Sequence, residues 1–215
     1  AYSNLGVILM TRGDLSGAEA MYQMALAIQE ELGHKEGMAG SYGNLGLILM
    51  TRGDLVGAEA MHRKALDINK ELGRKEGMAN DYGNLGNILS IRGDLDRAEA
   101  MLRKSLDINT ELGRKEGMAN QYGNLGNIRS VLGDLDVAEV MHRKSLEINE
   151  ELGRKEGMAR DCANLGNIFS KRGDLHGAEA MLRKSLDIDE ELGHKEGMAN
   201  DYINLGALAE IRGHL

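Results

Sequence analysis

The sequence predicts an all-α protein of stacked antiparallel helix hairpins, and three observations lead to this fold class. Helix formers dominate the 215 residues, whereas Pro and Trp are absent and there is a single Phe. The 29 glycines recur at fixed intervals, which is the pattern expected of helix ends. Between them, apolar residues recur with the period of an amphipathic helix.

A repeat of 40 residues organises the chain. Its clearest markers are the recurring glycines Gly13, Gly53, Gly93, Gly133, Gly173 and Gly213. A fixed period of this kind indicates a solenoid, because one hairpin buries too little apolar surface to fold alone. We therefore expect a single array over residues 1–215, with repeats at about 1–33, 34–73, 74–113, 114–153 and 154–193 and a partial repeat at 194–215.

The elements of one unit follow from its residues. A first helix is expected from residue 76 to about 91, with Tyr82, Leu85 and Ile88 in its apolar stripe. Gly93 suits the left-handed end of that helix, and Asp94 suits the N-cap of the next. The second helix should run from residue 95 to about 112, where Gly113 closes it. Each unit is thus a helix–turn–helix hairpin.

The two ends of the sequence fall inside the repeat pattern. The chain starts partway through a first helix and stops where a second helix should begin, so we expect a piece of a longer array. Removing the flanking repeats should expose apolar residues at both ends, namely Leu5, Ile8, Leu9, Leu205, Leu208 and Ile211. End-to-end or paired self-association is therefore possible.

Composition argues against several classes of partner. A net charge of −8 and a pI near 5.3 disfavour a nucleic-acid binder, which should carry a basic face. No apolar run is long enough to span a membrane. A single cysteine, Cys162, cannot form an intrachain disulfide and favours a reducing compartment, so a cytoplasmic location is expected.

Residues 82–106 resemble the tetratricopeptide repeat (TPR) family. Tyr82, the run Asn84-Leu85-Gly86-Asn87, Ala98 and the run Lys104-Ser105-Leu106 fall at the signature spacings of that family. The period is longer than usual, and the proline that commonly ends the second helix is missing; this longer form resembles the repeats of kinesin light chain and of Pins-type adaptors. The resemblance implies a right-handed α-solenoid (TPR-like) whose first helices line a concave, peptide-binding groove.

The resemblance also implies which residues face a bound peptide. They form a polar ladder with an apolar end: Asn44, Asn84, Asn124, Asn164, Asn87, Asn127, Asn167, Ser90, Ser130 and Ser170, with Leu47 and Met50. Asparagine offers both a donor and an acceptor to peptide amides. The alternative is that the Asn44 column bonds to neighbouring helices and sets repeat spacing. The basic pair that grips a C-terminal carboxylate in some TPR proteins is absent at Gly83 and Asn87.

The fourth repeat is irregular. Arg129 stands where other repeats have Leu or Phe, and Leu132 replaces the arginine of the turn. Arg129 could anchor an anionic group of a ligand in the groove, or its guanidinium could simply extend to water. Both readings stay open, and the second is favoured.

The Arg-Gly-Asp motifs, the histidines and the cysteine have structural explanations and do not indicate a reactive or metal-binding site. Arg-Gly-Asp recurs at 12–14, 52–54, 92–94 and 172–174, where turn formation explains Gly and Asp. The histidines form no i, i+4 ligand pair, so no metal is expected, and no cofactor either. Cys162 has no evident base beside it and suits a small buried position.

These observations favour a non-enzymatic scaffold that binds a protein or an extended peptide. The alternatives are a sensor or regulatory segment of a larger multidomain signalling protein, and a self-assembling structural array.

Overall fold

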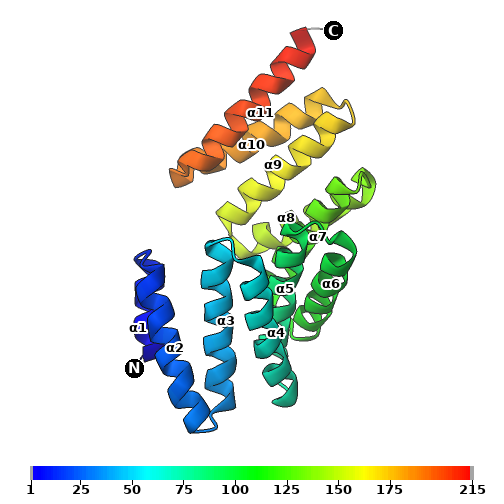
Figure 1. The fold of residues 1–215 in the computed structure, drawn as a ribbon. Helices are drawn as coiled ribbons and strands as arrows, with labels where there is room; N and C mark the ends of the chain where they lie inside the picture. Colours follow the sequence, from blue (N-terminus) through cyan, green and yellow to red (C-terminus); the bar gives the residue numbers. More distant parts are fainter. Residues whose placement is uncertain (1, 214–215) are drawn as a thin grey trace. The chain divides into compact units, whose positions relative to one another are not determined.

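The computed structural model of the chain describes residues 2–213, and all regular secondary structure in this range is α-helical (Figure 1). The helices are α1 (Tyr2–Thr11), α2 (Leu15–Glu31), α3 (Lys35–Thr51), α4 (Leu55–Glu71), α5 (Lys75–Ile91), α6 (Leu95–Glu111), α7 (Lys115–Val131), α8 (Leu135–Leu152), α9 (Lys155–Lys171), α10 (Leu175–Leu192) and α11 (Lys195–Gly213). The predicted hairpin is confirmed, because the two helices of each hairpin pack on each other.

Short connections with the expected chemistry join the helices. Gly93 has a φ of +81° between α5 and α6, and Gly113 has a φ of +65° after α6. Only glycine adopts such angles without strain. Asp54 caps α4 by accepting a 2.9 Å hydrogen bond from the backbone N–H of Gly57. The helix bounds predicted around residue 93 are therefore confirmed to within a residue.

The chain divides into two compact units, Ala1–Leu112 and Gly113–Leu215. In the first unit, the hairpins α1–α2, α3–α4 and α5–α6 pack in order along the chain. In the second unit, α7–α8 and α9–α10 are followed by α11, which packs on α10 and α9. This division falls one residue before the expected repeat boundary between residues 113 and 114. A single continuous array over residues 1–215 stays a prediction.

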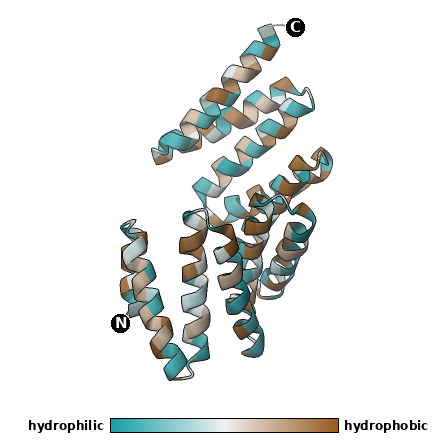
Figure 2. Ribbon diagram, in the orientation of Figure 1, coloured by the Kyte–Doolittle hydropathy of each residue, from teal (hydrophilic) through white to brown (hydrophobic). Residues whose placement is uncertain are grey.

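Apolar residues fill the space inside and between hairpins, and Figure 2 shows hydrophobic and hydrophilic residues interleaved along the helices. The glycine of the Asn-Leu-Gly triplet permits the close approach of the two helices in a hairpin. A methyl group on Gly166 would lie 2.7 Å from Cγ of Leu182, and one on Gly86 would lie 2.6 Å from Leu102. This crowding explains why the glycine recurs inside a helix despite its low helix propensity.

The expected exposure of the chain ends is wrong for part of the set. Leu5, Ile8 and Ile211 are exposed as expected. Leu208 is buried, because α11 packs it against Ala178 and Leu182 of α10. Leu9 and Leu205 are also partly covered by the adjoining hairpin helix, since each packs on an apolar cluster. Self-association through these ends stays a prediction.

None of the helices described here is both long and apolar enough to cross a membrane.

Candidate peptide-binding surface

Successive first helices lie side by side within each unit. α3 adjoins α5 in the first unit, and α9 adjoins both α7 and α11 in the second. Residues 40 positions apart therefore stand on neighbouring helices for the pairs α3–α5, α7–α9 and α9–α11, as the predicted ladder requires within a unit. One contact demonstrates this directly: Lys171 of α9 donates a 3.2 Å hydrogen bond from Nζ to Oγ of Ser130 on α7.

The predicted contact residues lie at the edge of the packed interior. The half-buried members are Asn44, Leu47, Met50, Asn84, Asn87, Ser90, Asn124, Arg129, Ser130, Asn164, Asn167 and Ser170, whereas Asn127 is exposed. Arg129 directs its guanidinium toward the turn, with Nη1 3.6 Å from Oδ2 of Asp134. The role of these residues in binding stays a prediction.

Each first helix from α3 to α11 carries a buried polar residue at one repeat position, which was not predicted from the sequence. These residues are Ser41, Asp81, Gln121, Asp161 and Asp201. Each occupies the same position in its repeat, one residue before the recurrent tyrosine position. We call the place where such a residue meets the preceding second helix a junction.

At the Asp161 junction the carboxylate is well supplied with donors. Oδ2 accepts hydrogen bonds from Oγ of Ser145 at 2.7 Å and from Nδ2 of Asn149 at 2.8 Å. Nδ1 of His142 lies 3.5 Å from Oδ1. Asp81 has a similar set, with Asn69 at 2.8 Å and His62 at 3.3 Å. Oδ2 of Asp161 is thus well paired, as a buried polar atom should be, whereas Oδ1 of Asp161 and Nδ1 of His142 have no hydrogen-bond partner among the described residues.

Arg154 closes the Asp161 junction on its outer side. Its guanidinium lies 3.2 Å from Oε1 of Glu116, donates to Oδ1 of Asn120 at 3.3 Å and donates to Oδ1 of Asn149 at 3.1 Å. The arginine thereby links the first helix α7, the second helix α8 and the following loop. Its side chain is 30% exposed.

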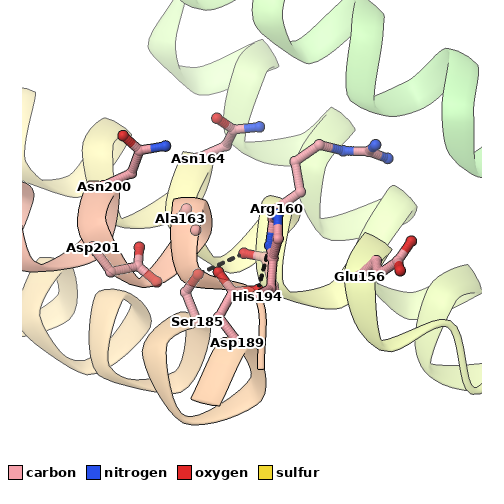
Figure 3. Close-up of a pocket in the computed structure, with 11 residues that line it drawn as sticks. Glu156, Arg160, Ala163, Asn164, Ser185, Asp189, His194, Asn200 and Asp201 are labelled. Carbon is pink, nitrogen blue, oxygen red and sulfur yellow. Dashed lines mark hydrogen bonds and ion pairs between the residues drawn. The ribbon is translucent and has the colours of Figure 1, made fainter. Parts of the chain in front are cut away.

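At the Asp201 junction the same place is an open cavity of about 440 Å³ (Figure 3). His194 replaces the arginine, and Asp189 replaces the asparagine of the second helix. The cavity lies between α9, α10 and α11, and its lining residues include Glu156, Arg160, Asn164, Ser185, Asp189, His194, Asn200 and Asp201. It therefore adjoins Asn164 of the predicted groove.

The electrostatics of this cavity differ from those of its neighbour. Asp201 is 1% exposed, and its Oδ2 atom has no hydrogen-bond partner within the chain. Burial raises the pKa of Asp201 and the charge of Asp189 raises it further, whereas a hydrogen bond from Ser185 opposes the shift. Asp189 is paired with His194, whose Nδ1 lies 3.1 Å from Oδ1 of the carboxylate. Two buried carboxylates thus share one cavity.

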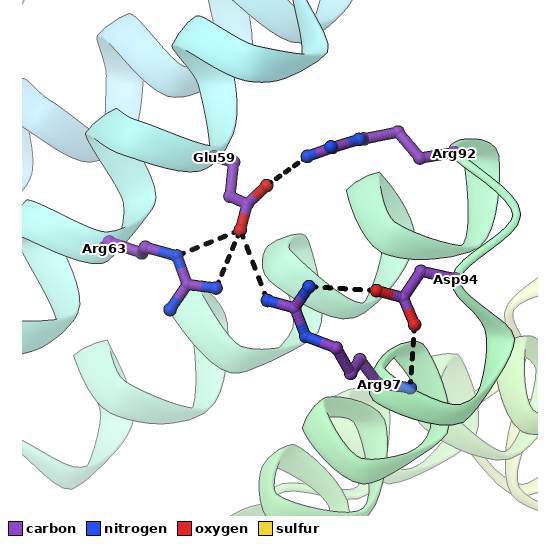
Figure 4. A network of polar contacts seen from close by, with 5 residues as sticks. All are labelled: Glu59, Arg63, Arg92, Asp94 and Arg97. Atoms are coloured by element: carbon purple, nitrogen blue, oxygen red, sulfur yellow. Dashed lines mark hydrogen bonds and ion pairs between the residues drawn. The ribbon is translucent and has the colours of Figure 1, made fainter.

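The Arg-Gly-Asp motif has a structural explanation in the 92–94 copy (Figure 4). Arg92 pairs with Glu59 of the preceding repeat, and Asp94 accepts from the backbone of Arg97 and pairs with its guanidinium at 2.9 Å. Arg63 also bonds to Glu59 at 2.7 Å. The hydrogen bonds from Arg63 lower the pKa of Glu59, with help from the other two arginine charges. The motif here ties hairpins together.

Cys162 occupies the tyrosine position of its repeat and is fully buried. Burial raises the pKa of its thiol to about 11, which leaves almost no thiolate at neutral pH. In other repeats the tyrosine ring makes a cation-π contact with a lysine; for example, Nζ of Lys144 lies 5.3 Å from the centre of the Tyr122 ring. Lys184 instead binds Glu150 at 2.9 Å. The thiol is not placed for nucleophilic chemistry.

The comparisons with known families identify the repeat. A family model described as MalT-like TPR region matches residues 1–151, and one described as Tetratricopeptide repeat matches residues 117–191. A comparison with curated proteins finds no match.

Solved structures with the same fold are similar to the chain at low identity. The apo form of RapI is 20% identical with a TM-score of 0.88, covering 96% of this chain and 76% of RapI. A putative kinesin light chain from Podosopora anserina with nearly identical TPR-like repeats is 16% identical with a TM-score of 0.71, covering 89% and 94%.

A signal transduction ATPase with numerous domains (STAND protein) from Pyrococcus horikoshii, which has a tetratricopeptide repeat sensor, is also similar. It is 18% identical with a TM-score of 0.82, and the match covers 99% of this chain but 33% of that one. At such identities the likeness shows the fold alone.

Proposed function

Since the chain belongs to the MalT-like tetratricopeptide repeat family, we propose that it is a non-catalytic scaffold that binds a protein or an extended peptide along its first helices. Repeat arrays of this kind present continuous surfaces that suit extended ligands. We further propose that it acts in the cytoplasm, where a free cysteine such as Cys162 stays reduced.

The observation that carries the proposal is the row of partly exposed asparagine and serine side chains on adjacent first helices. Asn124, Asn127 and Ser130 on α7 face the same side as Asn164, Asn167 and Ser170 on α9, because the two helices adjoin and the repeat period is constant. Side-chain amides arranged in this way can pair with the backbone of an extended peptide, which has unpaired donors and acceptors along its length. The turn contact of Arg129 makes it a secondary candidate.

The test is affinity capture from a lysate with the 215-residue chain and with a variant carrying Asn87→Ala, Asn127→Ala and Asn167→Ala together. We expect specific bound proteins to be lost from the variant. A matched control replaces Arg63, Arg103 and Arg183 by Ala, because these residues lie on second helices, away from the asparagine positions, and each pairs with a glutamate one turn earlier. Capture that survives the asparagine variant unchanged would contradict the groove assignment.

A second candidate function is a sensor segment of a larger signalling protein. The neighbour from Pyrococcus horikoshii supports it, since that protein is a multidomain signal transduction ATPase with a tetratricopeptide repeat sensor. In that case, ligand binding to the repeats should change the activity of a domain elsewhere in the same polypeptide. Nucleotide hydrolysis by the full-length protein, with and without captured ligand, separates this function from a free-standing scaffold.

A further inference from the structure

We propose that the cavity beside His194 binds the arginine side chain of a peptide held on this surface. This inference rests on the proposed peptide-binding function and adds the chemistry of one subsite. It follows from comparing two junctions of the same unit, whose helices are equivalent and whose residues differ at a few positions.

The first argument is what fills the equivalent place one repeat earlier. There the guanidinium of Arg154 contacts Glu116, Asn120 and Asn149. The residues at the same three repeat positions in the cavity are Glu156, Arg160 and Asp189, and all of them line it. Glu156 and Asp189 keep an acceptor at two of these positions, and Arg160 replaces the amide acceptor of Asn120 at the third. Because His194 takes the place of the loop arginine, the acidic groups of this junction are not covered by a guanidinium from the loop.

The second argument is the charge of the cavity. Asp201 lacks two donors that Asp161 has nearby: His142 is replaced by Leu182, and Asn149 is replaced by Asp189. Each of the two aspartates has one buried oxygen without a hydrogen-bond partner, Oδ1 of Asp161 and Oδ2 of Asp201, but Asp201 also has a second carboxylate, that of Asp189, beside it. An uncompensated buried carboxylate is costly, so a cation that enters the cavity gains a strong interaction.

The third argument concerns which cation fits. No group of three or more His, Cys, Asp or Glu side chains among residues 2–213 is arranged to hold a metal ion. An arginine side chain instead offers a flat head with five donors, which suits carboxylates together with amide oxygens. The cavity supplies both kinds of acceptor, from Asp189 and Asp201 and from Asn164 and Asn200. Its volume of about 440 Å³ leaves room for the aliphatic part of the side chain.

The cationic residue of the chain at the rim does not fill this place. Arg160 lines the cavity, but Figure 3 shows its guanidinium directed away from Asp189 and Asp201. The corresponding residue is asparagine in the two flanking repeats, Asn120 and Asn200. Arg160 therefore leaves the cavity in front of these two acidic groups unfilled.

The experiment is an NMR titration of the ¹⁵N-labelled 215-residue chain with N-acetyl-arginine methylamide. Matched probes carry citrulline, which has the same shape without the charge, or lysine, which has the charge without the planar head. We expect saturable shifts of the amides of Gly197, Asn200 and Asp201 with the arginine probe, and binding at least about tenfold weaker for citrulline and lysine.

Two exchange variants test the location. The double variant His194→Arg with Asp189→Asn reproduces the Arg154 junction, and we expect it to lose the shifts because its own arginine occupies the cavity. The reciprocal variant Arg154→His with Asn149→Asp should gain a second site with shifts at Gly157 and Arg160. The amide spectrum of each variant reports whether it is folded, and Asp201→Asn provides a second, smaller change that should also weaken binding about tenfold.

The proposal is overturned by an absence of saturable shifts, by equal affinity for the citrulline or lysine probe, or by shifts that persist in the folded double variant. These results would leave the peptide-capture experiment with the asparagine variant unaffected. Loss of capture there, together with arginine binding here, would in turn support both proposals.

Discussion

The Asp161 and Asp201 junctions share a backbone and a set of repeat positions, yet one is closed and the other is open. Asp161 is surrounded by Ser145, Asn149 and His142, and Arg154 covers the outer side. Asp201 keeps the serine, but the other three positions hold Asp189, Leu182 and His194. A cavity lined by two carboxylates results.

This difference shows how a repeat protein can acquire a binding feature without altering its fold. The junction stabilises the stack when the chain supplies its own donors and its own guanidinium. When those groups are replaced, the helices still pack through Leu182, Leu205 and Leu208. The polar positions then become available to a ligand, at some cost in stability.

The largest expected effect is a difference in stability between the variants Asp161→Asn and Asp201→Asn. Asp161→Asn should lower the free energy of unfolding by about 2–3 kcal/mol, because Ser145 and Asn149 lose a charged acceptor in a buried site. Asp201→Asn should leave it unchanged or raise it by up to about 1 kcal/mol, because it removes a poorly paired buried charge. Urea unfolding curves of the two variants measure both values. Equal losses would contradict the distinction between the junctions.

Exchanging Arg154 and His194, the loop residues at the outer side of the two junctions, should change the free energy of unfolding by a smaller amount. Arg154→His should destabilise the second unit by about 1 kcal/mol, since the three contacts of a partly exposed guanidinium are lost. His194→Arg should stabilise by a similar amount in the absence of ligand, because it neutralises the cavity. Thermal unfolding at low and high salt checks both changes. A destabilising His194→Arg would show that an arginine does not fit there.

The titration of Asp201 should contribute to the pH dependence of the free energy of unfolding. Because its pKa is raised in the folded state, the folded chain binds more protons than the unfolded chain from about pH 4 upward, and stability falls as pH rises through this window. The groups that face it from α9, α10 and the preceding loop are Glu156, Arg160, Cys162, Ser185, Asp189 and His194. Asp201→Asn should flatten this slope, as measured by urea midpoints between pH 4 and 7. An unchanged slope would contradict the raised pKa.

The smallest expected effect concerns reactivity rather than stability. Cys162 should resist iodoacetamide at pH 8 in the folded chain, because it is buried and its pKa is about 11. The matched control is Tyr202→Cys in a Cys162→Ala background, which places a thiol at the same repeat position but at an exposed site. We expect labelling of the control within minutes, measured by mass spectrometry. Rapid labelling of folded wild-type chain would contradict the burial of Cys162.

Local chemistry explains why the hairpins could be predicted from the sequence. Gly93 and Asp94 determine a helix end and a helix start through the backbone conformation of a few residues, so the bounds of α5 and α6 follow without tertiary information. The repeat then extends that prediction along the chain. Leu208 shows the limit: its position is apolar in every repeat, but its burial depends on contact with α10.

The junctions could not be predicted, because their contacts join residues on different helices. Ser105 bonds to the carbonyl of Ala79 and Asn149 bonds to Asp161, which the helical period of a single segment does not indicate. A signal was present in the columns of the repeat. His194 and Asp189 replace the Arg and Asn that occupy these two positions in the three preceding repeats, whereas the first repeat has His34 and Gln29 there.

The most direct test of this account is a selection of random peptides displayed on phage, carried out in parallel against the wild-type chain and the folded His194→Arg, Asp189→Asn variant. We expect peptides selected by the wild type to share an arginine at one position, and those selected by the variant to bind without that preference. Selected peptides with no arginine preference, or with the same preference for both chains, would contradict the central claim. That claim is that the cavity beside His194 binds an arginine of the ligand, where the preceding repeat has its own Arg154.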